Sequence, residues 1–576
     1  MNETFKNDFV ISEKEPSEKE KQLNEKLRSF LKEKNLFPTK ESERKKQEAL
    51  IGMKNLIEEF IIQTGVEQGL TREDAKKRGF MMRTSGSYRL DVHTPESDID
   101  IIIIFPRNIK KEHCFTIFKK LLDDDELATD IVPVEKATVP VIKLEYGGVE
   151  LDLLFAFLPY DYIDESIDLY GDEIVEKMKG RENRKAINGP RVAKALLDLV
   201  PNTDTFRLAY RGIKLWAQSR HVYANPVGFP AGIAWGLMLA RICRLYPRAN
   251  AAMIYKNFFK IFSKWQWTNN PCTLNDNYIG TTDLIRNEVW PNTMNTGWNE
   301  IMPVITPAYP RMNSTYNITD TTYKVLVDEW TRGAEIMDLI RQEKLEWDAL
   351  FEPSEIYVRF KNYIEITWSA ENEEDLKSWD GFLKSRVRFY FSEKERTIHE
   401  QGIFLRPDMK SYRNPDALEC KFYIGVAITK PVPPTIWDSL VNSHFTFDES
   451  TKRFDNREAF PDPVFKHIKR SQIPKYVFGE EREEQSTHRT ELLQINKQSK
   501  RRRWRKESIF EPLRSSRALQ KKKTGVDSSI VTKTDEDAAA ATTLEQPIQK
   551  KKRIDNRKNM ILRDLPEEEE GVQMLF

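Results

Sequence analysis

The stretch GSYRLDVHTPESDID at residues 86–100, followed by IIIIF at residues 101–105, decides the fold of this chain. The apolar run predicts a buried strand, and side chains alternate along a strand, so Asp98 and Asp100 project from one face at its edge. Two carboxylates this close repel each other unless a cation lies between them, and hard oxygen ligands suit Mg²⁺. Gly86 and Ser87 provide the close backbone approach and the hydrogen-bond donors that a polyphosphate needs. The combination predicts nucleotidyl transfer.

A second predicted strand carries a third carboxylate. The segment PVIKL at residues 140–144 precedes a turn at Gly147-Gly148, and VELDLLF at residues 149–155 follows it, which is typical of a hairpin. Asp152 stands among leucines, where a bare carboxylate is costly unless it is paired or bound to a metal, and Glu150 on the same face is the alternative ligand. A lone Asp-x-Asp pair is more often a solvated strand end, but the Gly-Ser turn, the spacing and the later Asp together favour a site.

Composition restricts the class of protein. With 576 residues, 39% hydrophobic residues and 12 tryptophans, the chain is long enough for three or four domains with a substantial core. No apolar run approaches the roughly 20 residues that span a bilayer, and the N-terminus lacks an apolar signal core, so we expect neither a membrane protein nor a secreted one. The 4 cysteines show no paired spacing, which suits a reducing compartment and gives no zinc pattern.

The net charge of the chain is near +1, but basic and acidic residues are concentrated in different segments. Seven of the ten residues at 497–506 are basic, and further basic clusters follow at 521–523 and 550–553. Such runs are typical of nuclear localisation signals or of arms that bind nucleic acid.

Changes in composition and periodicity predict five segments. Apolar positions from Glu41 onward follow helical spacing, which predicts a helix with one buried face. The region after residue 201 is predicted to be mainly helical. We expect Trp216 and Trp235 in its core. In the third folded segment we expect strands over 357–366 and 420–428 and a helix over 373–390; because no typical aromatic RNP1 motif is present, base stacking on an open sheet is not expected. The predicted segments are a polar N-terminal arm (1–36, a frayed helix or solvated), a catalytic domain (37–200), a helical central domain (201–350), an α+β domain (351–480) and a disordered basic tail (481–576).

From about Phe37 to about residue 470, the chain resembles the eukaryotic nuclear poly(A) polymerases, members of the polymerase-β-like nucleotidyltransferase superfamily. The Gly-Ser and Asp-x-Asp signals alone would also fit CCA-adding enzymes, oligoadenylate synthetases and uridylyl transferases, and the block from Lys214 to Trp235 narrows the resemblance. It implies an α+β multidomain fold with a polymerase-β-like nucleotidyltransferase domain, a mainly helical central domain, an RRM-like α+β C-terminal domain and a disordered basic tail. The matching segments include AINGPR (186–191), YRGIKLWAQ (210–218), VYAN (222–225), GFPAGIAW (228–235) and MPVITPAYP (302–310).

The resemblance implies a reaction that joins AMP from ATP to an RNA 3′-hydroxyl and releases pyrophosphate, with two metal ions roughly 3.5–4 Å apart. Asp98 and Asp100 would bridge both ions, and Asp152 would hold the ion that lowers the pKa of the 3′-hydroxyl. The expected ion is Mg²⁺, with Mn²⁺ as the alternative. Ser87 would bind the β- and γ-phosphates, with Lys214 as the cationic partner and Tyr223 donating its hydroxyl. From spacing alone, Lys214 would be a surface helix lysine, and Tyr223 and Asn225 would be loop residues that satisfy backbone groups.

The implied contacts divide into two sets. Thr138, Lys143 and Lys361 match family positions that approach the RNA, although Lys143 is equally explained as a solvated lysine at a strand end. The catalytic and metal-binding set is Asp98, Asp100 and Asp152. The implied ATP-binding set is Ser85, Gly86, Ser87, Thr94, Ser97, Asp98, Ile99, Asp100, Asp152, Asn188, Lys214, Tyr223, Asn225, Gly232 and Ile233.

Two positions depart from the family pattern. The family usually has an aromatic residue before Gly-Ser, where this chain has Ser85, and a glycine after Arg-Leu, where this chain has Asp91. Ser85 lacks a stacking surface, so we expect weaker primer or nucleotide affinity. Asp91 adds a carboxylate, which we expect to lie near the metals and to alter metal preference. Neither change removes a predicted metal ligand.

The function predicted from these observations is a template-independent polynucleotide adenylyltransferase that makes poly(A) tails on mRNA in the nucleus. Its expected partners are the RNA 3′ end, ATP and cleavage and polyadenylation factors; it would be a monomer without membrane attachment. The alternatives are another RNA nucleotidyltransferase, uridylyl or CCA-adding, and a catalytically weak RNA-binding scaffold. All three carboxylates, Ser87 and Lys214 argue against the scaffold, because burying uncompensated carboxylates has no structural benefit.

Overall fold

The computed structural model describes residues 10–135, 139–267, 270–274, 290, 300–442, 445–454 and 456–478. The predicted RNA contact Thr138 and the predicted tail at 481–576 lie outside the described residues.

Three helices open the chain: α1 (Glu18–Glu33), α2 (Lys40–Glu67) and α3 (Arg72–Lys77). As predicted, α2 buries an apolar stripe that includes Met53, Ile57 and Phe60. The prediction of a frayed or solvated arm over residues 1–36 is wrong for α1, which begins at a capping box and buries the ring of Phe30 4.9 Å from that of Phe351. High Lys and Glu content concealed the short apolar stripe that packs this helix on the rest of the chain.

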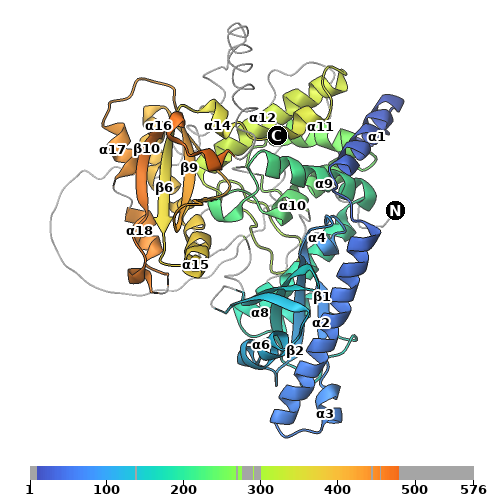
Figure 1. The fold of residues 1–576 in the computed structure, drawn as a ribbon. Coiled ribbons are helices and arrows are strands. Elements are labelled where there is room, and N and C mark those ends of the chain that lie inside the picture. The colour runs from blue at the N-terminus through green and yellow to red at the C-terminus, as the bar shows by residue number, and fades with distance from the viewer. Residues whose placement is uncertain are drawn as a thin grey trace, which may run out of the picture. The chain divides into compact units, whose positions relative to one another are not determined.

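The first sheet has the strand order β1-β2-β5-β4-β3. Strands β2 and β5 run parallel, whereas the other neighbouring pairs are antiparallel, and the predicted hairpin at Gly147-Gly148 joins β4 to β5. Ile101 and Ile103 pack with α2, while Ile102 and Ile104 pack with α8 on the opposite face (Figure 1). Helices therefore cover the sheet on two faces and leave the start of β2 at an edge. The strands are β1 (Met81–Thr84), β2 (Ile99–Pro106), β3 (Ala128–Val134), β4 (Val141–Tyr146) and β5 (Val149–Leu158). The helices of this part are α4 (Gly86–Arg89), α5 (Lys111–His113), η2 (Cys114–Phe118), α6 (Lys119–Asp123), α7 (Asp172–Lys177) and α8 (Arg181–Leu199).

A mainly helical part follows, as predicted. Trp216, Trp235 and Trp330 are fully buried there, and their indole rings meet edge to face, with the Trp216 and Trp235 centroids 5.6 Å apart. Aromatic pairs in this geometry bury large apolar areas and fix the angles between the helices. The elements are α9 (Thr203–Ser219), η3 (Asn225–Val227), α10 (Gly232–Leu245), α11 (Ala251–Phe262), α12 (Asp320–Arg341) and α13 (Asp348–Phe351).

The last folded part contains an antiparallel sheet with the strand order β10-β6-β9-β7, and β8 pairs with β9. The strand expected at 420–428 is β9, but residues 356–359 form a helix instead of the start of a strand, and the helix expected over 373–390 is divided near Ser385. The elements are α14 (Ile356–Arg359), β6 (Asn362–Ser369), α15 (Glu373–Lys384), α16 (Val387–Gln401), β7 (Ile403–Pro407), β8 (Tyr412–Arg413), β9 (Glu419–Ile428), α17 (Ile436–Val441), α18 (Phe445–Thr451), η5 (Arg457–Ala459), β10 (Val464–Lys469), η6 (Arg470–Gln472) and η7 (Lys475–Val477).

One face of this second sheet is covered by aromatic side chains. Tyr363 of β6 and Tyr423 of β9 are fully buried, and Tyr357 lies over them with its ring 5.9 and 6.0 Å from theirs. Phe478 closes the same cluster, 5.5 Å from Tyr357. The rings of Tyr363 and Tyr423 are therefore packed within this cluster.

A buried ionic cluster joins the helical part to the second sheet. Glu329 of α12 accepts a 2.8 Å hydrogen bond from Nε of Arg220 at the end of α9 and lies 2.9 Å from Nη2 of Arg406 on β7. All three side chains are almost fully buried. Arg220 also donates to the main-chain oxygens of Glu352 and Pro353, so the cluster links four segments.

Among the described helices, none combines the length and the apolarity needed to cross a bilayer.

Candidate active site

The register of two strands brings the predicted carboxylates together. Asp100 on β2 and Asp152 on β5 are direct Cα partners in the parallel pair, and Asp98 precedes β2 with its side chain exposed. Burial, together with the charges of Asp98 and Asp152, raises the pKa of Asp100 to about 6. Glu150 is exposed and pairs with Glu145 in the hairpin instead. The register therefore favours Asp152 over Glu150 as the third member of the acidic site.

The acidic site fits a bound cation on its chemistry. The charges of Asp98 and Asp152 raise the pKa of Asp100, and a divalent ion between the carboxylates removes this repulsion. The described His, Cys, Asp and Glu side chains do not by themselves form a closed group of three around one metal position. Lys143, the cross-strand neighbour of Asp152, forms an ion pair with that carboxylate.

Only glycine fits at position 86, where the backbone passes close to the carboxylate of Asp100. Its φ is 59°, in the left-handed region, and a Cβ atom at this position would fall on Oδ2 of Asp100. The main-chain N–H of the preceding Ser85 donates to the Asp100 carbonyl at 2.9 Å. Ser87 follows, half-buried, on the single turn of α4. The Gly-Ser turn therefore lies directly against the carboxylate of Asp100.

Asp91 turns toward two arginines of α9 and not toward Asp98, Asp100 and Asp152, so the expectation that it adds a fourth carboxylate beside these predicted metal ligands is wrong. Its carboxylate lies 3.5 Å from Nε of Arg207 and 3.7 Å from Nη2 of Arg211, and it is absent from the charges that shift the pKa of Asp100. Asp91 has a φ of 57°, the left-handed conformation that favours glycine, which explains the usual family residue here. Arg211 also donates to the main-chain oxygen of Asp91 at 2.8 Å.

We expect Asp91→Gly to be more stable to unfolding than Asp91→Ala by about 1 kcal/mol, because both lose an exposed ion pair but only alanine keeps the left-handed strain. Denaturant titration of the two variants and the wild type measures this difference. Metal preference, compared as activity in Mg²⁺ and in Mn²⁺, should be unchanged in both variants. An alanine variant as stable as the glycine variant would contradict the assigned backbone strain.

Lys46 is a buried cation that the sequence argument missed. Its side chain is only 2% exposed, and its ammonium donates to the Thr94 carbonyl at 2.8 Å in the loop that leads to Asp98. Burial lowers the pKa of Lys46, while the charge of Asp98 acts in the opposite direction. Lys46 lies one turn before Ala49 on the buried stripe of α2, and this continuation of the helical spacing is the signal that could have identified it.

Hydrogen bonds between its own residues also stabilise the loop before Asp98. The Thr94 N–H donates to Oγ of Ser97 at 2.9 Å, and the two hydroxyls lie 2.9 Å apart. Arg211 of α9 donates to the main-chain oxygens of His93 and Leu36. Thr94 and Ser97, both predicted nucleotide neighbours, thus hold the turn that positions Asp98.

Lys214 and Tyr223 face the acidic site from the helical part. Burial lowers the pKa of Lys214, while the charges of Asp98 and Asp100 act in the opposite direction. Burial, with the same two charges, raises the pKa of Tyr223 to about 12. Gly232 lies beside this tyrosine, since a Cβ there would come within 2.5 Å of the Tyr223 hydroxyl oxygen.

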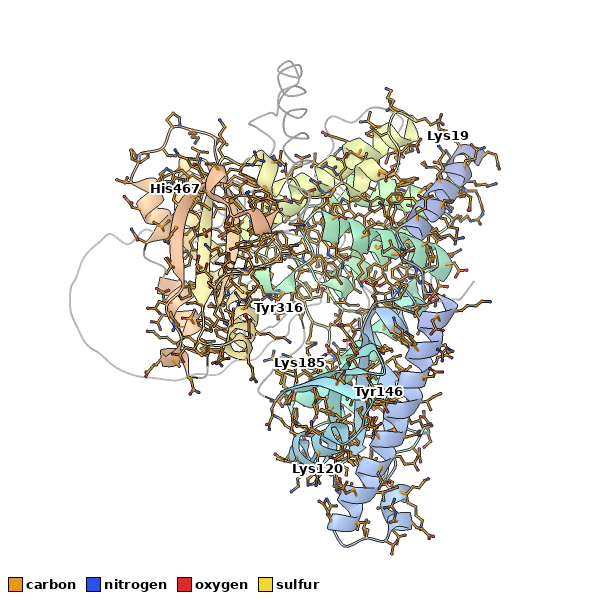
Figure 2. All side chains as sticks on the ribbon, viewed as in Figure 1. Lys19, Lys120, Tyr146, Lys185, Tyr316 and His467 are labelled. Carbon is orange, nitrogen blue, oxygen red and sulfur yellow. The ribbon has the colours of Figure 1, made fainter. Side chains whose placement is uncertain are left out.

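A cavity of about 670 Å³ opens onto Asp100, a volume in the range of small-molecule sites. Asn188 and Asn225 each have a buried side-chain oxygen without a hydrogen-bond partner among the described residues; Asn188 lines the cavity, while Asn225 lies in η3, where its main-chain oxygen accepts from Asn317. Figure 2 labels Lys185 and Tyr316, which also line the cavity. Of the residues predicted to bind ATP, five line the cavity: Ser85, Gly86, Asp100, Asn188 and Ile233.

Lys361, a predicted RNA contact, does not line the cavity, whereas the predicted nucleotide contact Ser85 does. Lys361 is exposed just before β6, and its main-chain oxygen accepts from the N–H of Arg470 at 3.0 Å. Ser85 is buried in the cavity wall, where a Cβ on Gly189 would lie 3.2 Å from its side chain. The position that is usually aromatic in the family is therefore packed against α8.

Paired acidic strands beside a glycine turn, with a half-buried lysine and tyrosine near the carboxylates, are typical of the nucleotidyltransferase class. Comparison with family profiles agrees on this class: residues 10–200 match the description "Poly(A) polymerase nucleotidyltransferase domain", and residues 205–353 match "Poly(A) polymerase central domain".

Individual relatives identify the family within the nucleotidyltransferase class. The chain is 36% identical to a poly(A) polymerase, PAPa, of Candida albicans, over 70% of this chain and 72% of that one. It is 32% identical to nuclear poly(A) polymerase 1 of Arabidopsis thaliana and 33% identical to a poly(A) polymerase of Dictyostelium discoideum, over 78% and 82% of this chain. The chain belongs to the poly(A) polymerase family. It spans 63% and 59% of the length of the Arabidopsis and Dictyostelium relatives.

Among solved structures, the chain is similar to Cid1 poly(U) polymerase with bound MgGTP, with 12% identity and a TM-score of 0.42, over 58% of this chain and 99% of that one.

Proposed function

We propose that the chain is a template-independent polynucleotide adenylyltransferase that transfers AMP from ATP to the 3′-hydroxyl of mRNA and releases pyrophosphate. The observation that carries this proposal is the register pair Asp100 and Asp152, which faces Lys214 and Tyr223 beside one cavity. Family membership supplies the nucleotide and the acceptor, since the relatives are named as poly(A) polymerases.

Asp98, Asp100 and Asp152 would hold two divalent ions, Mg²⁺ or alternatively Mn²⁺. When bound, the ions supply positive charge to the α-phosphate and lower the pKa of the attacking 3′-hydroxyl. All three carboxylates would act as metal ligands, with Asp152 assigned to the ion that activates the 3′-hydroxyl. Lys143 pairs with Asp152, and its exposed position on β4 suits an approach to RNA phosphates.

The remaining residues bind and orient the triphosphate. Gly86 allows the backbone to pass close to the phosphates, and Ser87 would donate to the β- and γ-phosphates. Lys214 supplies a compact positive charge opposite Asp98 and Asp100. Because the pKa of Tyr223 is raised to about 12, its hydroxyl stays protonated at neutral pH and donates a hydrogen bond to an anionic phosphate.

The sugar and base would occupy the cavity. The partnerless oxygens of Asn188 and Asn225 suit acceptance of hydrogen bonds from a ribose hydroxyl or the adenine amino group. Gly232 and Ile233 begin α10 next to Tyr223, and Ile233 lines the cavity. Shape and a few hydrogen bonds would then select adenine.

We also propose that the C-terminal part is RRM-like, because its strands occur in the order strand-helix-strand-strand-helix-strand with the sheet order β10-β6-β9-β7. Its covered sheet face leaves RNA contacts to other surfaces, and Lys361 is one exposed candidate. The basic runs after residue 497 would direct the protein to the nucleus, where it would act as a monomer with cleavage and polyadenylation factors.

Primer extension tests the proposed reaction. Purified full-length protein is given a short oligo(A) primer, a divalent ion and each of the four nucleoside triphosphates in turn, alongside the Asp100→Ala variant. We expect extension with ATP and little with the other three, and none with the variant. Preference for UTP or CTP would identify the uridylyl or CCA-adding alternative, and no extension with any nucleotide would favour the scaffold.

We expect Lys214→Ala to lower kcat/KM for ATP by about 10- to 100-fold, and Tyr223→Phe by somewhat less, because each loses a charge-assisted hydrogen bond to the triphosphate. Steady-state kinetics with varied ATP measure the loss, and RNA affinity should be unchanged. Lys214→Arg should not restore full activity, since a planar guanidinium cannot replace a compact ammonium. Weakened RNA binding with normal ATP kinetics would contradict these roles.

A further inference from the structure

The end of α9 is held by residues from later parts of the chain. Nη2 of Arg406 on β7 donates to the main-chain oxygen of Arg220 at 2.8 Å. The main-chain N–H of Ser354 donates to the Ser219 carbonyl at 2.7 Å. Carbonyls in the last turn of a helix have no partner within the helix, so these donors supply the missing hydrogen bonds. Tyr223 follows shortly after this anchored helix end.

His221 has a backbone conformation that favours glycine. It comes directly after Arg220, the cap residue of α9, and its φ is 54°. Helices commonly end on a left-handed residue at this position, and glycine is usual there because a Cβ atom causes strain. A compensating interaction is therefore expected from the side chain of the histidine.

The imidazole of His221 contacts a carboxylate of the C-terminal sheet. Its Nδ1 lies 2.7 Å from Oδ1 of Asp408, which directly follows β7 and has no exposed surface. Oδ2 of the same carboxylate accepts hydrogen bonds from the hydroxyls of Tyr357 at 2.6 Å and Tyr412 at 2.8 Å. The N–H of Asp408 donates to the Tyr423 carbonyl at 2.9 Å. Groups of the C-terminal part thus fix the carboxylate that meets His221.

A short and well-fixed run of chain connects His221 to Tyr223. The residue between them, Val222, has no exposed surface, and its N–H donates to the Ala217 carbonyl at 2.8 Å. The Tyr223 hydroxyl lies beside Gly232 at the start of α10, where a Cβ would come within 2.5 Å of it. The direction in which the tyrosine leaves the backbone therefore depends on the conformation of His221.

We propose that His221 and Asp408 are positioning residues that hold the Tyr223 hydroxyl toward the triphosphate, so that the C-terminal sheet contributes to nucleotide binding. The inference rests on the proposed function, because it takes Tyr223 as a ligand of the triphosphate. Neither His221 nor Asp408 lines the cavity, so they act through the chain that leads to the tyrosine. A hydrogen bond to an anionic phosphate depends on the position and the angle of its donor, so a small displacement weakens it.

The test is nucleotide binding by full-length protein carrying His221→Gly. Glycine suits the left-handed backbone, so this variant should fold while it loses the contact with Asp408. Affinity for MgATP is measured by isothermal titration calorimetry without RNA, and kcat/KM for ATP by primer extension. We expect both to fall about fivefold to tenfold, because a displaced donor loses most of a charge-assisted hydrogen bond. Asp408→Asn keeps the size of the side chain and should cause a similar loss.

Two double variants show whether His221 acts through these partners. In the Tyr223→Phe background, which lacks the hydroxyl, His221→Gly should change the affinity for MgATP by less than about twofold. His221→Gly combined with Asp408→Asn should bind no more weakly than either single variant, because changes that remove the same contact are not additive. A merely structural role of His221 would instead give the same loss of affinity in every background.

Glu343→Gly is the matched control. Glu343 also comes directly after the cap residue of a helix, α12, with a φ of 59°. Its exposed carboxylate lies 2.9 Å from Nζ of Lys19. This variant, like His221→Gly, places glycine at a left-handed position and removes one polar contact. We expect it to bind MgATP as the wild type does.

Unchanged affinity for MgATP in folded His221→Gly would overturn the proposal. An equal loss in the Tyr223→Phe background or in Glu343→Gly would also overturn it, because the effect would then not pass through the tyrosine hydroxyl. His221→Gly and its Tyr223→Phe double variant decide the matter even where Asp408→Asn does not fold. A wild type that binds MgATP and shows these couplings but extends no primer would contradict the proposed function and leave this inference intact.

Discussion

Replacing Asp100 with alanine is expected to reduce AMP incorporation by at least about a thousandfold, because the proposed active site then loses a metal ligand and several kcal/mol of transition-state stabilisation. The same variant is expected to be at least as stable as the wild type in the absence of metal. Its carboxylate is buried against Asp98 and Asp152, which raise its pKa, so removing it relieves repulsion. Activity and thermal stability would therefore change in opposite directions, which misfolding cannot imitate.

The measurement is single-nucleotide extension of an oligo(A) primer, combined with melting curves with and without Mg²⁺. We expect Mg²⁺ to raise the melting temperature of the wild type but not of Asp100→Ala. Asp98→Ala and Asp152→Ala should lose activity to a similar extent. Glu150→Ala is the matched control, since it removes an exposed carboxylate from the same strand as Asp152. Near-normal activity of Asp152→Ala with loss in Glu150→Ala would reverse the assignment of the third ligand.

Replacing Glu329 with alanine is expected to lower the free energy of unfolding by about 3–5 kcal/mol, because it leaves Arg220 and Arg406 buried without their counterion. Burial acts to raise the pKa of Glu329, but the two arginines outweigh it and hold the pKa at about 2. A depressed pKa stabilises the folded state above the unfolded value near 4.5, and this contribution is lost as the pH falls toward 2. The variant should accordingly differ most from the wild type at neutral pH.

Denaturant titration at pH 7 and at pH 4 measures the difference. Asp328→Ala is the control on the adjacent position of α12, where the carboxylate pairs with the partly exposed Arg359 at 3.0 Å. We expect that variant to lose about 1 kcal/mol or less. Equal losses in the two variants would show that the buried position of Glu329 has no special importance.

Much of the site was predictable because it depends on patterns within short stretches of the sequence. The Ile101–Phe105 run predicted β2, the Gly-Gly step predicted the hairpin, and the spacing of Asp98 and Asp100 predicted one shared edge. Sequence could not give the partner of Asp100, because the β2 and β5 register depends on packing with α2 and α8. The partnership of Lys143 with Asp152 depends on the same register.

The errors have a common origin in contacts between distant segments. Asp91 has no local signal that its carboxylate turns toward Arg207 and Arg211, which follow more than a hundred positions later. In the sequence, Lys46 does not differ from an ordinary surface lysine of a helix. Only the fold brings its ammonium to the Thr94 carbonyl. Helix α1 was obscured by its charged composition, although its buried stripe packs on helices far along the chain.

The main-chain pairing of β2 with β5 fixes the separation of Asp100 and Asp152 without help from their neighbours' side chains. The opposite wall of the cavity, with Glu300, Thr306 and Tyr316, comes from a separate stretch of chain. Substitutions at residues 300–316 can therefore reshape the cavity without changing the separation of Asp100 and Asp152, so the shape of the cavity and the position of these carboxylates can change independently.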